Sequence, residues 1–482
     1  MRGIIERTAA PGCRPRTGTC QLRRISVPRV VVISPPFRSH AAPLSILGAA
    51  LRDAGADVTL ACAPAFADLA ERHRLGFAPL TVTRNANHGI AERTAQANDE
   101  AERLREFLEA TRDGAVAALL TQARHRRADM LPDPDRILSE ISALDDSARP
   151  DWYLVDQLSY PVTLAMHCLG LPYATFCPGH PSYIPTGPDA FFGLPYAWPD
   201  TVRPDPHALA RLRTAAAVND LAFTEAFRRV VHRQAVEVPV PERAFALCSP
   251  HAVVFNYPEF PWLPAAPEGP AAIYTGHCTA RPAASGLDEF WRATVARLTS
   301  GGRPLVLIAF GTFLSARDDV LRTVTEAVLE RTQASVIVAA GNRIEDLVHD
   351  PRLAAAPPDR LCVAEAVPQQ ELLGHASVMV HHGGNNSFTE CLTAGVPMAV
   401  LPFSSDQFAI AHDLERAGLG ACLDPNTLEV DSMGAAVGGL LAGPRGAHAS
   451  RRAEVLAAGP QFAAGRLMCL MAGVARTGAA AR

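Results

Sequence analysis

The sequence predicts an α/β protein with two domains, each built on a parallel β-sheet of the Rossmann-like kind. Short apolar runs that alternate with helical segments begin near residue 29, and a second such series begins near residue 304. Between the two series, residues 258–286 are rich in proline, alanine and glycine, which is typical of a linker. In residues 378–407, a strand, a glycine-rich turn, a helix, a second strand and a polar loop follow one another.

The length of 482 residues suits two to four domains at roughly 100–200 residues each. We divide the chain into a basic N-terminal extension, a first α/β domain, a linker, a second α/β domain and a C-terminal helix, over 1–28, 29–265, 266–286, 287–460 and 461–482. The extension is rich in arginine but lacks the apolar core of a signal peptide, so we expect it to be disordered.

Charge and cysteine content exclude several function classes. The formal net charge of −4 argues against nucleic acid or an anionic membrane as the main partner. No run of about twenty apolar residues is present, so no spanning helix is predicted. The eleven cysteines are scattered without a CxxC pair, which favours reduced thiols in a cytoplasmic protein and provides no metal-site spacing.

The first domain begins with a β-branched strand over 29–34, followed by a loop that ends at His40 and a helix from about Pro43 to Ala54. No GxGxxG pattern follows the strand, so dinucleotide binding is not predicted. An imidazole at the rim of a sheet is suited to general base catalysis, because its ordinary pKa near 6.5 leaves it mostly neutral at cytoplasmic pH. His40 is therefore a candidate base.

A second candidate, Asp156, ends a strand that begins after Pro150 and precedes a helix predicted over 160–169. Because parallel strands end at the same rim, Asp156 should lie near His40, where its carboxylate could orient the imidazole. The alternative interpretation is that Asp156 caps the next helix or pairs with a surface arginine. Asp151 is a weaker candidate, since it precedes the strand.

Two segments of the first domain depart from the α/β rhythm. Residues 91–127 are helix-forming and highly charged, and we interpret their apolar stripe (Leu104, Phe107, Leu108 and Leu119) as core packing beside a solvated face. Residues 178–204 are rich in proline and aromatic residues. This segment either shapes an apolar substrate pocket or is an irregular packed loop.

The second domain contains predicted strands at 304–310, 335–340, 361–364, 378–380 and 397–401. After the fourth strand, a turn with two histidines, two glycines and two asparagines leads to a helix that is predicted to begin near Ser387. The unpaired amides and positive dipole end of such a helix bind anions such as phosphate. The alternative is that Ser387 and Glu390 form a capping box, and that His381 and His382 are ordinary strand-end histidines.

This segment resembles the donor-binding signature of the family 1 glycosyltransferases, the UDP-glycosyltransferase-like enzymes of the GT-B fold. The positions that match are His382, Gly384, Asn386, Ser387, Glu390, Gly395, Pro397, Asp406 and Gln407. The resemblance implies that the diphosphate is held by His382, Asn386 and Ser387. It further implies that Glu390 accepts from ribose hydroxyls and that Asp406 and Gln407 hold the sugar.

The resemblance covers about residues 29–475 and adds further implied roles. The turn Gly311-Thr312 is similar to the family's first donor-domain loop, and the remaining positions implied to contact the donor are Val367, Gln369 and Asn385. Residues 37–43 are similar to the loop that carries the family's catalytic histidine, which implies that His40 is the base and forms a dyad with Asp156. In GT-B enzymes the C-terminal helix crosses back to the first domain.

Three positions depart from the plant-type pattern of the family. Ala366 and Asn385 stand where tryptophans are usual, and Ile410 stands where asparagine is common. Without the indole that stacks on uracil, the nucleotide is open between UDP and TDP. These departures favour a bacterial enzyme of the natural-product type.

The expected function is therefore an inverting transfer of a sugar from a nucleotide diphosphate sugar to a hydroxyl of a small-molecule acceptor. Neither a metal nor another cofactor is expected. Two alternatives remain: a GT-B epimerase that acts on the nucleotide sugar itself, and a non-catalytic nucleotide-sugar-binding partner of another transferase. The sequence leaves the acceptor, the sugar and the oligomeric state open.

Overall fold

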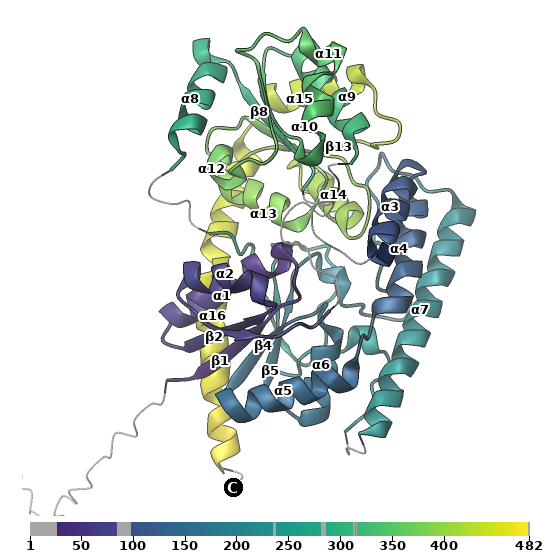
Figure 1. The fold of residues 1–482 in the computed structure, drawn as a ribbon, viewed down its shortest axis with the longest axis vertical. Coiled ribbons are helices and arrows are strands. Elements are labelled where there is room, and N and C mark those ends of the chain that lie inside the picture. Colours follow the sequence, from purple (N-terminus) through teal and green to yellow (C-terminus); the bar gives the residue numbers. More distant parts are fainter. Residues whose placement is uncertain are drawn as a thin grey trace, which may run out of the picture.

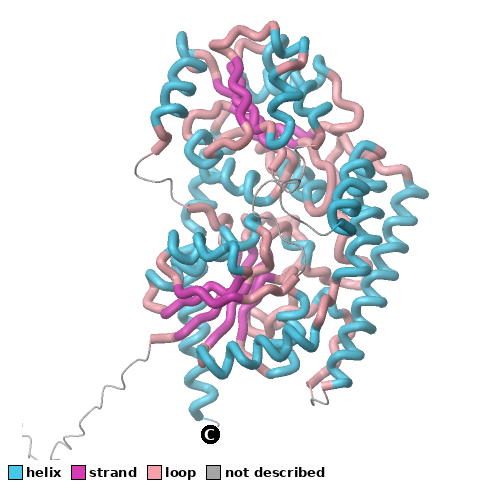
Figure 2. The backbone as a smooth tube through the Cα atoms, viewed as in Figure 1, coloured by secondary structure: helices cyan, strands magenta, loops and turns pink. Residues whose placement is uncertain are grey.

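The computed structural model describes residues 27–83, 98–234, 238–280, 286–311, 314 and 316–480. They form two α/β lobes, which lie one above the other in Figure 1, and each lobe contains one parallel sheet (magenta in Figure 2). The predicted fold class of two parallel-sheet domains is confirmed. Residues 1–26 of the predicted extension lie outside the described residues.

The first domain holds a 7-stranded sheet with the strand order β3-β2-β1-β4-β5-β6-β7. Its strands are β1 (Arg29–Ile33), β2 (Asp57–Cys62), β3 (Gly76–Pro79), β4 (Trp152–Asp156), β5 (Tyr173–Cys177), β6 (Ala252–Phe255) and β7 (Ala271–Tyr274). Its helices are α1 (Arg38–Asp53), α2 (Ala67–His73), α3 (Asn98–Arg112), α4 (Ala115–Asp129), α5 (Pro134–Ala148), α6 (Tyr160–Leu169) and α7 (Pro206–Arg233).

The second domain holds a 6-stranded sheet with the order β10-β9-β8-β11-β12-β13. Its strands are β8 (Leu305–Ala309), β9 (Ser335–Ala339), β10 (Leu361–Ala364), β11 (Val378–His381), β12 (Met398–Val400) and β13 (Gly420–Cys422). Its helices are α8 (Glu289–Leu298), α9 (Asp318–Arg331), α10 (Ile344–Val348), α11 (Pro351–Ala354), α12 (Gln369–Leu373), α13 (Asn385–Ala394), α14 (Gln407–Arg416), α15 (Val430–Ala442) and α16 (Gly446–Ala480).

The continuous apolar runs of the central strands follow from burial of both sheet faces. In β1, Val30 and Val32 join a buried cluster with residues of α1 and α16. Val31 and Ile33, on the other face, pack with residues of α5 and α6. Strand β8 divides its side chains between two clusters in the same way.

The two strand orders place a topological switch point in each domain. In the first sheet β1 pairs with both β2 and β4, and in the second sheet β8 pairs with both β9 and β11. The chain segments that follow β1 and β4 lead to opposite sides of the first sheet, and those that follow β8 and β11 do so in the second. A crevice therefore opens at the carboxyl ends of each of these strand pairs. At the carboxyl ends of these four strands lie Asp156, the last residue of β4, Gly311 and His382, while His40 follows β1 in the first turn of α1.

Two predicted boundaries of the first domain are wrong. The segment 266–286, predicted to be a linker, contains β7, which pairs with β6 and completes the first sheet. Its high content of proline and glycine reflects the turns around a short edge strand. Helix α1 begins at Arg38 rather than near Pro43, because Phe37 is extended and the backbone turns helical directly after it. His40 therefore lies in the first turn of the helix and not in the preceding loop.

Helix α16 connects both lobes, as its yellow ribbon shows in Figure 1. It is kinked at Gly459-Pro460, where a proline removes a helical hydrogen bond. Before the kink it contacts α13, and after the kink Ala463, Ala464 and Leu467 pack in the cluster that contains α1. Among the described helices, α16 is long and apolar enough to span a membrane over Gly446–Gly473, and 39% of an apolar 18-residue stretch within it is buried inside the protein.

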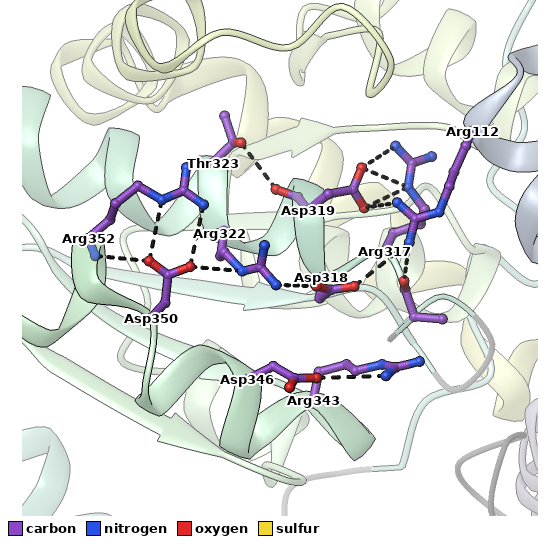
Figure 3. Close-up of polar contacts among 11 residues, drawn as sticks. Arg112, Arg317, Asp318, Asp319, Arg322, Thr323, Arg343, Asp346, Asp350 and Arg352 are labelled. Atoms are coloured by element: carbon purple, nitrogen blue, oxygen red, sulfur yellow. Dashed lines mark hydrogen bonds and ion pairs between the residues drawn. The ribbon is translucent and has the colours of Figure 1, made fainter.

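Ionic contacts join α3 of the first domain to the start of α9 in the second (Figure 3). The Arg112 guanidinium lies 3.0 Å from an Asp319 carboxylate oxygen and donates to the Ala316 carbonyl at 3.0 Å. Arg317, only 2% exposed, pairs with Asp319 at 2.9 Å and donates to the Thr111 carbonyl, also at 2.9 Å. The carbonyl of Thr111 belongs to the last turn of α3, which lacks helical donors, so this bond also caps that helix end.

A buried carboxylate makes a second contact between the domains. Asp413 of α14 is fully buried and accepts from Trp262 Nε1 at 2.9 Å and from the Tyr257 hydroxyl at 2.8 Å. His180 Nδ1 accepts from the Ser182 amide, so its Nε2 carries the proton and donates to Asp413 at 3.0 Å. The Tyr196 hydroxyl also donates to it. Burial opposes ionisation, but these hydrogen bonds hold the pKa of Asp413 below its usual value.

Replacement of this carboxylate should destabilise the contact between the domains. The Asp413→Ala variant leaves four donors without their acceptor, and two of them, His180 and Tyr257, are fully buried. We therefore expect the free energy of unfolding to fall by about 3–5 kcal/mol. Urea unfolding measures the loss. Asp431→Ala is the matched control, because the Asp431 side chain is 79% exposed and pairs with Arg331 at the surface. Equal stability of the two variants would contradict the role of Asp413.

Candidate functional site

A cavity of about 780 Å³ lies where residues of both domains meet. Of the predicted site residues, those that line it are His40, Gly311, Gln369, His382, Gly384, Asn385, Asn386, Ser387, Asp406 and Gln407. Asp156 lies directly behind His40, whereas Val367 and Glu390 are not among the lining residues. Thr312 lies outside the described residues.

His40 and Asp156 form a hydrogen-bonded pair. His40 Nδ1 lies 3.0 Å from Asp156 Oδ2, with the His40 side chain 17% exposed and the Asp156 side chain fully buried. An ionised carboxylate can only accept a hydrogen bond, so Nδ1 carries the proton and the lone pair of the neutral ring is on Nε2. The pair forms because β1 and β4 are hydrogen-bonded neighbours, with Ile33 opposite Val155 one residue before Asp156.

The structure excludes the interpretations in which Asp156 caps the next helix or pairs with a surface arginine. Asp156 Oδ1 accepts from the Leu158 amide at 2.9 Å, so one oxygen holds the turn after β4 while the other holds the imidazole. Helix α6 has Ser159, not Asp156, at its N-cap. Asp151 accepts from the Arg29 amide at 2.7 Å at the opposite end of the strand, away from His40.

The turn after β11 holds His382 between two glycines. A Cβ at Gly311 would lie 2.7 Å from His382 Cε1, and one at Gly384 would lie 2.4 Å from His382 Nε2, so neither position accepts a side chain without moving the imidazole. Gly383 has a φ of 86°, which favours glycine. Burial lowers the pKa of His382 to about 4, so the ring is neutral at pH 7 and has one N–H to donate.

Helix α13 begins two residues earlier than predicted. Gly384 is its N-cap, and the first helical hydrogen bond runs from the Phe388 amide to the Gly384 carbonyl. The amides of residues 385–387 precede that bond, as an anion site at a helix start requires. Ser387 is inside the helix, so the capping-box alternative is wrong.

Glu390 is bonded to the neighbouring helix α12. Its carboxylate accepts from Gln369 Nε2 at 2.6 Å and from Gln370 Nε2 at 2.9 Å. Burial raises the pKa of Glu390. Gln369 also donates to the Ser387 hydroxyl at 3.2 Å, so these side chains form one network at the start of α13.

The two asparagines at the start of α13 bond to the first domain. Asn385 Nδ2 donates to the carbonyls of Pro178 and Asn256 at 2.8 and 2.7 Å. Asn386 Nδ2 donates to the Ser39 carbonyl at 2.9 Å. Pro43 lies four residues after Ser39 and has no N–H, so this carbonyl has no helical donor and is free to accept across the cavity.

Asp406 and Gln407 are already engaged in hydrogen bonds. Asp406 Oδ2 accepts from the His180 amide of the first domain at 2.9 Å. Gln407 Oε1 accepts from the amides of Phe403 and Ser404 at 2.8 and 3.1 Å, which holds the loop that ends β12. Both residues line the cavity, but one oxygen atom of each side chain already accepts hydrogen bonds from backbone amides of the protein.

The first domain provides an aromatic wall that sequence patterns located only in part. Phe192 and Tyr183 line the cavity. The segment 178–204 therefore shapes a pocket, which was one of its two predicted roles. In the apolar stripe, Leu108 is in the core with residues of the second domain, but Leu104 and Phe107 line the cavity.

Arg126 and Tyr160 also line the cavity and were not identified from the sequence. Arg126 lies in a run of basic residues that resembles a solvated helix face, and Tyr160 lies in an apolar helix. Only their position against the cavity distinguishes them from neighbouring residues.

Comparison with known proteins identifies the family. The family profile described as UDP-glucoronosyl and UDP-glucosyl transferase matches residues 177–446, which is more than half of the chain. The chain belongs to this family. The matched segment includes the turn with His382, the start of α13 and the loop with Asp406, and it begins after the segment that holds His40 and Asp156.

Individual relatives match shorter segments. NDP-glycosyltransferase YjiC of Bacillus licheniformis is 34% identical over 140 residues, which is 29% of this chain and 34% of the relative. Demethyllactenocin mycarosyltransferase of Streptomyces fradiae is 29% identical over 133 residues, or 27% of each chain. The matches thus span about a third or less of these relatives' length.

Solved structures of glycosyltransferases share the architecture of this chain. The glycotransferase of kitacinnamycin superimposes with a TM-score of 0.64 at 21% identity, covering 92% of this chain and 99% of the other. Glycosyltransferase VinC, solved in complex with DTDP, has a TM-score of 0.60 at 18% identity, covering 92% and 99%. Together with the two facing parallel sheets, these likenesses confirm the predicted GT-B fold.

Protonation of His381 should govern part of the acid sensitivity of this site. The ring is fully buried, Nδ1 accepts from the Gly383 amide, and burial lowers its pKa from 6.5 to about 3. Below pH 6.5 the imidazole of the unfolded chain binds a proton, whereas the buried ring of the folded protein stays neutral down to about pH 3. The contribution of His381 to the stability of the folded state is therefore complete above pH 6.5 and is lost as the pH falls toward 3.

The His381→Gln variant should therefore lose less stability on acidification. Between pH 7 and pH 5 we expect its free energy of unfolding to fall by about 2 kcal/mol less than that of the parent, measured by urea unfolding. His349→Gln is the control, because the His349 side chain is 75% exposed. A pH dependence equal to that of the parent would show that His381 does not contribute.

Proposed function

We propose that this protein transfers a sugar from a nucleotide diphosphate sugar to a hydroxyl of a small-molecule acceptor, with inversion at the anomeric carbon. The observation that carries the proposal is the His40–Asp156 pair, at 3.0 Å, in a cavity that also contains the start of α13. The pair belongs to the first domain and the start of α13 to the second, which supports a displacement between a proposed base and a proposed anion site.

In the proposed reaction His40 Nε2 takes the proton of the acceptor hydroxyl. The oxygen attacks the anomeric carbon, a new C–O bond forms, and the bond from that carbon to the diphosphate oxygen breaks. Asp156 holds the ring through Nδ1–H and stabilises the imidazolium that results. Attack from the face opposite to the leaving group accounts for inversion.

The leaving nucleotide diphosphate takes up the electron pair and lies against the start of α13. The amides of residues 385–387, the positive end of the helix dipole and a neutral His382 N–H would stabilise its charge. We propose that no metal takes part, so EDTA should leave the rate unchanged. Glu390 would accept from ribose, while Asp406 and Gln407 would hold the sugar after exchanging some of their present hydrogen bonds.

The nucleotide is proposed to be UDP or TDP and the acceptor a natural product. The family description names UDP-sugar transferases, and one structural neighbour was solved with DTDP. The relative from Streptomyces fradiae is named for transfer to demethyllactenocin. All cysteines that the structure describes are free thiols, in line with our proposal that the protein acts in the cytoplasm.

Product analysis by mass spectrometry tests the proposal. The purified chain is incubated with UDP-glucose or TDP-deoxysugars and a panel of phenolic and macrocyclic acceptors, and we expect a glycoside of inverted anomeric configuration. Incubation with the donor alone distinguishes an epimerase, which would release an altered sugar nucleotide without acceptor. Failure to turn over any donor would favour a non-catalytic partner.

Substitution of the pair tests the base. His40→Ala should lower kcat by about 100- to 10,000-fold, because general base catalysis contributes that much, while nucleotide binding remains. Asp156→Asn should lower kcat as well, since an amide no longer selects the tautomer with Nδ1–H. Asp151→Asn, at the other end of β4, is the matched control. Full activity of His40→Ala would exclude the proposed base.

The Gly384→Ala variant tests the anion site. The added methyl group would lie 2.4 Å from His382 Nε2, so the imidazole must move. We expect UDP and TDP to bind about tenfold more weakly by calorimetry, as loss of one charge-assisted hydrogen bond predicts, with thermal stability little changed. Gly439→Ala is the control, since nothing lies within 4 Å of its Cβ position. Unchanged nucleotide affinity would remove His382 from the proposed site.

A further inference from the structure

Arg126 is a cationic side chain in the aromatic wall of the cavity. Its guanidinium carbon lies 4.7 Å from the ring centroid of Phe192. Its neighbours on α4 have polar partners, since Arg124 pairs with Glu106 and Arg127 donates to Asn219. Within the described parts of the chain, no carboxylate forms an ion pair with Arg126.

The charge of Arg126 is therefore only partly compensated. Burial lowers the pKa of this guanidinium, and Tyr183, Tyr160 and Asp406 oppose the shift. Asp406 Oδ2 already accepts from the His180 amide and makes no ion pair with Arg126. Arg126 is partly exposed where it lines the cavity. A partly buried cation without a direct partner loses part of its solvation, and a bound anion would offset that loss.

Tyr160 adds a buried hydroxyl to the same wall. Tyr160 is 8% exposed and lines the cavity. Its hydroxyl has no hydrogen-bond partner among the described residues. The rings of Tyr160 and Phe192 are 6.0 Å apart, and the Arg126 guanidinium lies over the same Phe192 ring. A guanidinium and a phenol hydroxyl both donate, so an anionic acceptor of hydrogen bonds suits them.

We propose that Arg126 and Tyr160 form a binding subsite for the carboxylate of an acidic aromatic acceptor. A planar guanidinium matches a carboxylate, and the rings of Phe192 and Tyr183 provide apolar surface for an aromatic body. The subsite rests on the proposed function and makes it more specific, because it names the acceptor class.

The position of the subsite favours the acceptor over a uronic acid donor as the source of the carboxylate. Arg126, Tyr160 and Phe192 all belong to the first domain. Tyr160 begins the helix that follows Asp156, so it lies on the side of the proposed base. The anion site for the nucleotide lies on the second domain, at the start of α13.

Binding to the complete chain tests the subsite directly. The probes are a hydroxynaphthoate and the hydroxynaphthamide of the same substitution pattern, which differ in charge and little in shape. Calorimetry should show tighter binding of the hydroxynaphthoate by about 10- to 100-fold, as expected for a hydrogen bond to a charged group.

In Arg126→Met this preference should disappear, while the hydroxynaphthamide binds within about threefold of the parent value. Arg126→Lys should restore part of the preference, because it retains the charge without the planar fork. Tyr160→Phe should weaken the hydroxynaphthoate by about threefold to tenfold, as for one neutral donor. Arg124→Met is the matched control, since that exposed side chain pairs with Glu106.

Two results would overturn the subsite. Equal weakening of both probes in Arg126→Met would show that Arg126 only supports Phe192. If Arg126→Met lost turnover of UDP-glucuronate relative to UDP-glucose but kept its preference for the hydroxynaphthoate, Arg126 would be assigned to binding of the sugar.

The proposed function fails independently of these results. If no donor is turned over but the parent still prefers the hydroxynaphthoate by calorimetry, the subsite stands and the transferase proposal does not. If glycosides form from neutral acceptors and neither probe is preferred in binding, the transferase stands and the subsite does not.

Discussion

The buried Asp413 carboxylate holds the two halves of the site in register. It belongs to the second domain, and its four donors, His180, Tyr196, Tyr257 and Trp262, all belong to the first. A buried carboxylate needs all of these donors at hydrogen-bond distance, and this requirement fixes how the domains can approach each other. The same loop that brings His180 to Asp413 also brings the His180 amide to Asp406 in the cavity.

Further hydrogen bonds bridge the two domains at the start of α13, beside the cavity. Asn386 reaches the Ser39 carbonyl, which Pro43 leaves without a helical donor, and Asn385 reaches Pro178 and Asn256. A nucleotide sugar bound at the start of α13 would lie against these same side chains. These side chains already make hydrogen bonds within the protein, so each hydrogen bond to a ligand replaces an existing one and adds less binding free energy. Selectivity between ligands therefore depends on how well each ligand replaces those hydrogen bonds.

Much of the fold was predictable from local patterns. The apolar runs of β1, β4, β8 and β11 are buried on both faces, and such strands have a distinctive continuous hydrophobicity. Boundaries were less predictable where local composition misleads. Strand β7 is short and surrounded by proline and glycine, and α1 begins before its internal proline because the backbone at Phe37 determines the start.

By itself the sequence determined the two-domain α/β class, the chemical types at the strand ends and the turn around His382, because these depend on periodicity and on the backbone freedom of glycine. Only the tertiary structure decided that β1 and β4 are adjacent, which brings His40 to Asp156 at 3.0 Å. Likewise, only the fold placed Arg126 and Tyr160 on the cavity wall, since an arginine in a basic run and a tyrosine in an apolar helix have no local signal. Their roles depend on what each side chain faces, and that is fixed by packing between segments far apart in the chain.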